Sequence, residues 1–134
     1  MNILVDSSVW IDSFNPKVNS REKELLEKLI SNDCRIYLCP VIYHEVLQGI
    51  KDEKIFEQIK SVFLHYRMIN FDIMNVTNYV VDLYRHLRKT GITIRKSVDC
   101  LIASYAILAD MYLLHNDSDF SLITAGSRLK TVKV

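Results

Sequence analysis

Short apolar runs alternate along the chain with apolar positions at helical spacing. Residues 2–5, 35–38 and 111–114 are short, mainly apolar segments bounded by polar turns, so each predicts a strand. Weaker patterns at residues 68–71 and 129–134 predict two more strands. Apolar runs that do not alternate with polar residues are typical of parallel sheets covered by helices on both faces.

Between these strands the apolar positions follow the period of a helix. The pattern predicts helices at about residues 20–31, 40–49, 55–63, 76–90 and 97–109, and two shorter ones after residues 8 and 118. Asn19 is expected to begin the first of the longer helices and Ser97 to cap the last. Ser7 or Ser8 is expected to cap the short helix near the start of the chain.

Strands separated by helices predict an α/β protein with a mainly parallel sheet, because parallel neighbours need a crossover between them. We expect a three-layer α/β/α arrangement with about 4–5 strands. The chain has 134 residues, which is enough for one domain with its own core. A single domain over residues 1–134 is therefore expected.

Composition narrows the class of protein. The chain is 49% hydrophobic and 25% charged, as in ordinary soluble globular proteins, and no apolar run reaches the length of a membrane span. Three cysteines without a C-x-x-C pair predict free thiols in a reducing cytoplasm, and no signal peptide is visible. The net charge of +1 argues against coating nucleic acid by bulk electrostatics, although it permits a local basic patch.

Four carboxylates stand among apolar neighbours. Asp6 and Asp117 each follow a predicted strand, Glu45 lies on the inward stripe of a helix, and Asp99 falls in a first turn. Each has a simple alternative role: turn residue or N-cap for Asp6, turn residue for Asp117, helix-dipole stabilisation for Asp99, and a buried ion pair for Glu45. If strands 2–5 and 111–114 are neighbours, Asp6 and Asp117 emerge side by side at their carboxyl ends.

Such a group of acids needs a proton or a cation. Carboxylates about 4–6 Å apart repel each other by several kcal/mol at an effective dielectric constant near 20. Mg²⁺ or Mn²⁺ is the natural partner, because hard divalent ions prefer oxygen ligands whereas zinc prefers Cys or His. Asp119 is a second-rank member, either as a fifth acid or as the cap of a short helix.

The order of these acids resembles that of the PIN-domain proteins, particularly the VapC toxins of toxin–antitoxin pairs. The segment DSSVWID at residues 6–12 resembles the opening motif of the family, and DCLIA at residues 99–103 resembles its third motif. Glu45 stands at the second position, and NDSDF at residues 116–120 resembles the fourth. The match spans nearly the whole chain.

The resemblance implies a ribonuclease that depends on Mg²⁺ or Mn²⁺. Its catalytic acids would be Asp6, Glu45, Asp99 and Asp117. We expect Asp6, Asp99 and Asp117 to bind the metal directly or through water, and Glu45 to bind it or to orient the attacking water.

Two further positions enter through the same resemblance. Ser8 matches a hydroxyl position near the acids, in the second rank with Asp119. His115 stands where many members of the family have a small hydroxyl residue. A role carried by that hydroxyl in the family therefore does not transfer to this position.

The resemblance also implies partners. The substrate would be a structured RNA such as tRNA or rRNA, cut to leave a 5′-phosphate and a 3′-hydroxyl. A VapB-like antitoxin would hold the enzyme inactive, and a homodimer is expected. Five cations occur between Leu83 and Asp99 without an acid among them, and of these Lys89, Arg95 and Lys96 are the candidate RNA contacts.

Two alternatives stay open at this stage. The chain is either another metal-dependent phosphohydrolase or a non-catalytic PIN-like interaction module. For the module, aromatic residues would line a groove for a partner helix. The aromatic candidates are Trp10, Phe14, Tyr43, Phe56 and Tyr84. A zincin site is excluded, because Gln48 stands where the second histidine of that motif is required.

Overall fold

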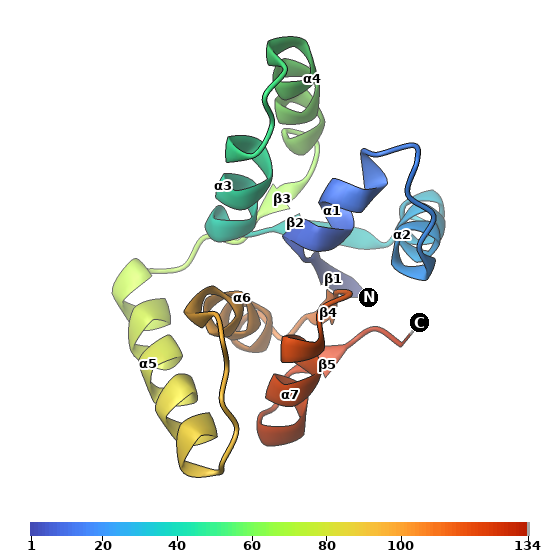
Figure 1. Cartoon of the computed structure of the whole chain (residues 1–134). Helices are drawn as coiled ribbons and strands as arrows, with labels where there is room; N and C mark the ends of the chain where they lie inside the picture. The colour runs from blue at the N-terminus through green and yellow to red at the C-terminus, as the bar shows by residue number, and fades with distance from the viewer. Residues whose placement is uncertain (134) are drawn as a thin grey trace.

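One parallel sheet, with the strand order β3-β2-β1-β4-β5, forms the centre of the molecule (Figure 1). The computed structural model describes residues 1–133. Its strands are β1 (Asn2–Val5), β2 (Arg35–Leu38), β3 (Arg67–Met68), β4 (Tyr112–Leu114) and β5 (Lys130–Thr131). All four pairings between neighbours are parallel, as the sequence predicts.

Helices connect every pair of consecutive strands. They are α1 (Ser7–Ser13), α2 (Arg21–Ser31), α3 (Pro40–Gln48), α4 (Glu53–Phe63), α5 (Ile73–Lys89), α6 (Ser97–Leu108) and α7 (Ser118–Gly126). In Figure 1, α1 to α4 gather on one side of the sheet and α5 to α7 on the other. The expected three-layer α/β/α arrangement is thus confirmed. Among the helices of residues 1–133, none is long and apolar enough to cross a membrane.

The core explains why the central strands carry no polar alternation. Ile3, Leu4 and Val5 of β1 are fully buried, as are Leu113 and Leu114 of β4. Both faces of these strands are covered, so both sets of side chains must be apolar. Burying a Leu, Ile or Val side chain stabilises the fold by about 1.5–3 kcal/mol, which makes this pair of strands a firm base for the residues that follow them.

The three predicted N-caps differ from those in the structure. Asp6, not Ser7 or Ser8, is the N-cap of α1: its backbone is extended and its carboxylate accepts a hydrogen bond from the Ser8 amide. The N-cap of α2 is Ser20, one residue after the predicted Asn19, and Ser97 lies inside α6 after the N-cap Lys96. An N-cap oxygen must reach an amide two or three residues ahead, and composition alone does not fix that register.

The outer strands are shorter than predicted. The pattern at residues 68–71 predicted a strand where β3 covers only Arg67–Met68, because the chain turns into α5 at its N-cap Asp72. At the other edge β5 covers Lys130–Thr131, and the predicted end of that strand at Val134 lies outside the described residues. Short edge strands present few unpaired backbone groups to other chains.

Candidate active site

The two central strands place Asp6 and Asp117 at the same edge of the sheet. β1 pairs in parallel with β4, with Val5 opposite Leu114, and the Asp6 amide donates to the Leu114 carbonyl at 2.9 Å. From β1 the chain moves first toward β2 and later returns on the other side to β4. Ligands of open α/β sheets bind at such a reversal, outside the carboxyl ends of the strands. The expected adjacency of the two strands is confirmed.

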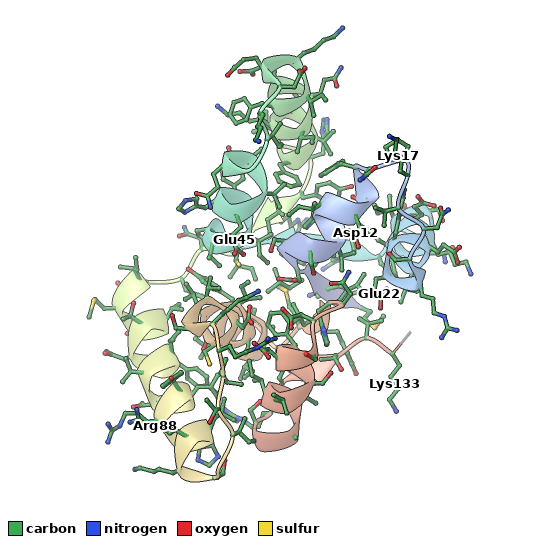
Figure 2. All side chains as sticks on the ribbon, viewed as in Figure 1. Asp12, Lys17, Glu22, Glu45, Arg88 and Lys133 are labelled. Atoms are coloured by element: carbon green, nitrogen blue, oxygen red, sulfur yellow. The ribbon has the colours of Figure 1, made fainter. Side chains whose placement is uncertain are left out.

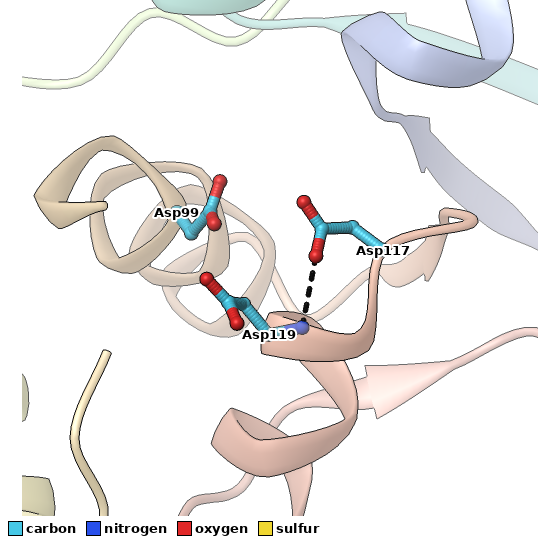
Figure 3. A group of neighbouring side chains, drawn as sticks. All are labelled: Asp99, Asp117 and Asp119. Carbon is cyan, nitrogen blue, oxygen red and sulfur yellow. Dashed lines mark hydrogen bonds between the residues drawn. The ribbon is translucent and has the colours of Figure 1, made fainter. Parts of the chain in front are cut away.

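Three carboxylates meet at this edge. Oxygens of Asp99, Asp117 and Asp119 all lie within 4.8 Å of one another. Figure 3 shows Asp99 projecting from α6 toward Asp117, at the end of the loop after β4, and toward Asp119, in the first turn of α7. Asp117 is the N-cap of α7 and accepts a hydrogen bond of 2.9 Å from the Asp119 amide. Capping the helix therefore also fixes the spacing of these two acids.

Two oxygens of this acidic cluster (Asp99, Asp117 and Asp119) are buried without a hydrogen-bond partner. They are Oδ2 of Asp99 and Oδ2 of Asp119, on residues that are 5% and 2% exposed. A buried polar atom without a partner costs about 1–3 kcal/mol, and more when it is charged. A cation would satisfy both oxygens. The donor set consists of carboxylate oxygens, which suits a hard divalent ion such as Mg²⁺ or Mn²⁺.

Burial and crowding change how these acids bind protons. Burial raises the pKa of Asp99 to about 7, and the neighbouring charges of Asp117 and Asp6 act in the same direction. Burial also raises the pKa of Asp6, although hydrogen bonds from Ser8 oppose the rise. A raised pKa means that the ionised carboxyl lacks stabilising partners, which agrees with the unpartnered oxygens.

Hydroxyl groups of α1 hold the two acids on the other side of the site. The Ser8 hydroxyl donates to Oδ2 of Asp6, and the Ser7 hydroxyl donates to Oε1 of Glu45 at 3.0 Å. Glu45 is half-buried on α3 and makes no ion pair within residues 1–133, so the alternative of a buried ion pair does not apply. Burial raises the pKa of the Cys39 thiol, and the charges of both carboxylates raise it further.

Two of the three candidate RNA contacts lie against the acidic cluster. The Arg95 guanidinium is 3.4 Å from Oδ1 of Asp119, and the Lys96 ammonium is 3.9 Å from Oδ2 of Asp117. Their side chains are 71% and 61% exposed, so both remain accessible to a ligand. Lys89 is exposed at the end of α5 and makes no ion pair within the described part of the chain.

His115 and Asn116 fix the loop that carries Asp117. Nδ1 of His115 accepts a hydrogen bond of 3.2 Å from the Asp117 amide, and the imidazole packs on Phe120 with ring centroids 5.1 Å apart. Nδ2 of Asn116 donates to Oδ2 of Asp12 at 3.0 Å, which ties the loop to α1. Burial lowers the pKa of His115, which favours the neutral ring.

Comparison with known proteins identifies the family. The model of the PIN domain matches residues 3–125. The chain belongs to the PIN-domain family.

Similar sequences and structures agree with this assignment. The PIN domain described here is 29% identical over 128 residues to VapC ribonuclease Mb1587 of Mycobacterium bovis and to ribonuclease VapC11 of Mycobacterium tuberculosis, with 96% of each chain covered. It has the fold of VapBC2 from Rickettsia felis, solved with a promoter DNA fragment, with a TM-score of 0.76, 20% identity and 98% of both chains covered. FitAcB from Neisseria gonorrhoeae gives a TM-score of 0.74 at 18% identity, with coverage of 98% and 96%.

The acids taken from the PIN-domain motifs are not equally placed. Asp99 and Asp117 belong to the acidic cluster. Asp6, the third predicted metal ligand, is held by Ser8 outside the cluster, and Glu45 is held outside it by Ser7. The second-rank Asp119 is buried within the cluster, and the sequence did contain a signal for it. Its position in the first turn, two residues after the acid that caps the helix, brings its backbone amide to the Asp117 carboxylate.

Proposed function

We propose that this protein is a divalent-metal-dependent endoribonuclease and the toxin of a toxin–antitoxin pair. The observation that carries the proposal is the acidic cluster, with two buried, unpartnered carboxylate oxygens at the carboxyl edge of the sheet. The names of the curated relatives, both VapC ribonucleases, support the activity. Structural neighbours solved as VapBC2 and as a toxin–antitoxin complex from Klebsiella pneumoniae support the toxin role.

In this proposal Asp99, Asp117 and Asp119 hold Mg²⁺ or Mn²⁺, and Asp6 binds it directly or through water. The bound ion would polarise the scissile phosphate and lower the pKa of a water molecule. The Ser8 hydroxyl keeps Asp6 in place, and the Ser7 hydroxyl keeps Glu45 aimed from α3. Glu45 is then free to orient the attacking water, since its second oxygen Oε2 makes no hydrogen bond within residues 1–133.

The substrate in this proposal is a structured RNA such as tRNA or rRNA. An acidic site repels phosphate, so nearby positive charge must offset the repulsion. Arg95 and Lys96 supply it, because both are exposed and lie within 4.0 Å of the acids. Lys89, at the end of α5, would contact the same RNA farther from the cut.

The partner in this proposal is an antitoxin that covers an apolar groove. The groove, a hollow of about 270 Å³, is formed by α1, α3, α4 and the loops that follow α1 and α3. Its apolar lining residues are Ile11, Phe14, Val46, Ile50, Ile55 and Ile59. Ile11 and Ile55 are 52% and 47% exposed, and exposed apolar side chains around a hollow are typical of protein-binding surfaces. An amphipathic helix of the antitoxin fits this chemistry.

Assembly and location complete the proposal. The family resemblance supports a homodimer. Three free cysteines, two of them buried, support a reducing cytoplasm as the place where the protein acts.

The activity is tested with the purified protein and a mixture of tRNA and rRNA. We expect cleavage with Mg²⁺ or Mn²⁺ and none after EDTA. Asp6→Asn should lower the rate by at least about a hundredfold while circular dichroism shows an unchanged fold. Glu27→Gln, an exposed acid of α2, is the matched control and should cleave like the parent. Metal-independent cleavage, or full activity of Asp6→Asn, would contradict the proposal.

A further inference from the structure

A second, polar hollow adjoins the acidic cluster. It has a volume of about 340 Å³ and opens between the first turn of α2, the loop from β4 to α7, and the end of β5. Its lining residues are Glu22, His115, Asn116, Asp117, Ser118 and Ser121, completed by Thr131 and Val132. Because Asp117 belongs to both the hollow and the acidic cluster, a group bound in the hollow lies directly beside the acids.

The lining offers several free hydrogen-bonding groups. The hydroxyls of Ser118 and Ser121 make no hydrogen bond within residues 1–133. His115 uses Nδ1 for the Asp117 amide, so Nε2 remains available, and Asn116 uses Nδ2 for Asp12, so Oδ1 remains available. The imidazole adds a flat ring, and single-stranded bases are commonly bound by stacking on such rings together with hydrogen bonds to their edges.

Glu22 contributes negative charge to the polar hollow. Its side chain is half-buried in the first turn of α2, lines the hollow, and makes no ion pair or hydrogen bond among the described residues. Figure 2 shows Glu22 near the loop between β4 and α7, and its charge acts on the imidazole of His115. A carboxylate only accepts hydrogen bonds at neutral pH, so its partner in a ligand must be a donor.

The hollow is unsuited to a phosphate group. Neither lysine nor arginine lines it, whereas Glu22 and Asp117 do, so an anion would be repelled. The cations of the site, Arg95 and Lys96, lie against the acidic cluster instead. The phosphate and the base of one nucleotide therefore have separate places: the backbone beside the cations, and an uncharged hydrogen-bonding ring in the polar hollow.

We propose that the polar hollow binds one unpaired nucleobase of the RNA next to the cut, and that Glu22 selects bases with an amino group. Guanine, adenine and cytosine present such donors, whereas uracil presents two carbonyl oxygens and only one ring N–H. The volume lies near the lower end of the range of ligand sites, about 300–1,000 Å³, and suits a single base rather than a larger group. This inference rests on the proposed ribonuclease function.

The test uses a hairpin RNA library with a randomised loop and the full-length protein with Mn²⁺. Sequencing of the new 5′ ends gives the base preference at each position around the cut. We expect the parent to favour amino-bearing bases over uracil by about tenfold at one position beside the cut. In Glu22→Gln the preference should fall to within about twofold, because an amide both donates and accepts. Glu24→Gln, an exposed acid of the same helix, should keep the parent's preference.

Two further measurements separate the possible outcomes. Titration calorimetry with Mn²⁺ should give the same affinity for Glu22→Gln and the parent; a loss of affinity would place Glu22 in the metal site and overturn the inference. Ser121→Phe, which fills the hollow from α7, should raise KM without changing Mn²⁺ affinity. If the parent cuts RNA and Glu22→Gln keeps the same base preference, the nucleobase subsite is wrong. If the parent cuts no RNA, the proposed function itself fails.

Discussion

The Asp99 carboxyl is buried among other acids, which destabilises its ionised form. Burial, together with Asp117 and Asp6, raises its pKa to about 7, against an ordinary value of 3.8. The folded state therefore holds a proton that the unfolded state has lost between about pH 4 and pH 7. Stability contributed by this proton is full below about pH 4 and disappears as the pH rises through 7. Above that, the folded protein contains an ionised, buried carboxylate.

Asp99→Asn removes this penalty, because an amide does not ionise. Without metal, we expect the stability of Asp99→Asn relative to the parent to improve by about 1–2 kcal/mol between pH 5 and pH 8. Urea denaturation in EDTA at both pH values measures the difference. Added Mg²⁺ should then stabilise the parent more than Asp99→Asn. If the two proteins differ in free energy of unfolding by the same amount at pH 5 and at pH 8, this account is contradicted.

Single residues also show what the sequence could predict about the site. Asp6, Asp99 and Asp117 were predicted as site residues because each interrupts an apolar pattern at a strand or helix end. Asp119 was placed in the second rank because a cap of the short helix explained it as well as a fifth acid did, whereas the structure buries it beside Asp99 and Asp117. The pairing of Ser7 with Glu45 was not predictable, because it joins side chains 38 residues apart on two helices.

At the scale of elements, periodicity predicted the central strands and the long helices well. It was least accurate at the edges, where β3 and β5 have only two residues each and little apolar pattern to identify them. Their lengths depend on where the neighbouring helices begin and on how much of the adjacent strand remains to be paired. Those are tertiary effects that a short stretch of sequence does not contain.

Gly126, the last residue of α7, controls how closely that helix approaches its neighbours. A Cβ at this position would lie 2.7 Å from Leu87 of α5 and 2.8 Å from Ile92 in the loop leading to α6. Leu87 is fully buried, so its terminal methyl can shift only by displacing packed neighbours. The close approach matters for the site, because α6 and α7 carry Asp99 and Asp119.

We therefore expect Gly126→Ala to lower the free energy of unfolding by about 1–2 kcal/mol, the usual cost of overpacking. Gly49→Ala is the matched control: its φ is −81°, its Cβ would meet only ordinary contacts at 3.6 and 3.8 Å, and its stability should be unchanged or slightly higher. Urea denaturation of the two variants and the parent measures the difference. Equal stabilities for Gly126→Ala and Gly49→Ala would show that α7 adjusts freely.

At the scale of the whole molecule, the order of strands creates the site. The sequence predicted parallel strands, but the adjacency of β1 and β4 was conditional, because pattern alone does not say which strands pair. Once β1 lies between β2 and β4, the acids after β1 and β4 must emerge together. The resemblance to the PIN-domain family implied this fold over nearly the whole chain, and the family match over residues 3–125 agrees.

The apolar groove and the acidic cluster share no residue, so antitoxin binding and RNA cleavage should separate. Ile55→Asp places a charge in the groove and should weaken the complex with the cognate antitoxin by at least about tenfold, since an apolar contact is replaced by a desolvated carboxylate. RNA cleavage by the free protein should be unchanged. Ile30→Asp, which alters an exposed isoleucine of α2 outside the groove, is the control. Binding is measured by calorimetry. Equal affinities of both variants for the antitoxin would contradict the proposal that the groove binds it.

The overall charge predicts a weak dependence of RNA binding on salt, and the local charges predict where that dependence arises. A chain of net charge +1 attracts RNA only weakly at long range, so the cations beside the acidic cluster must supply most of the attraction.

Each lost phosphate contact should reduce the slope of log(kcat/KM) against log[salt] by about 0.7–0.9. We expect that change, with a raised KM, for Lys96→Gln, whose ammonium lies 3.9 Å from Asp117. Lys54→Gln on α4 gives the protein the same net charge as Lys96→Gln. Lys54 is not one of the cations beside the acidic cluster, so this variant should leave the slope unaltered. Equal slopes for the two variants would mean that RNA responds only to the net charge of the molecule, and Lys96 would then have no contact with the substrate.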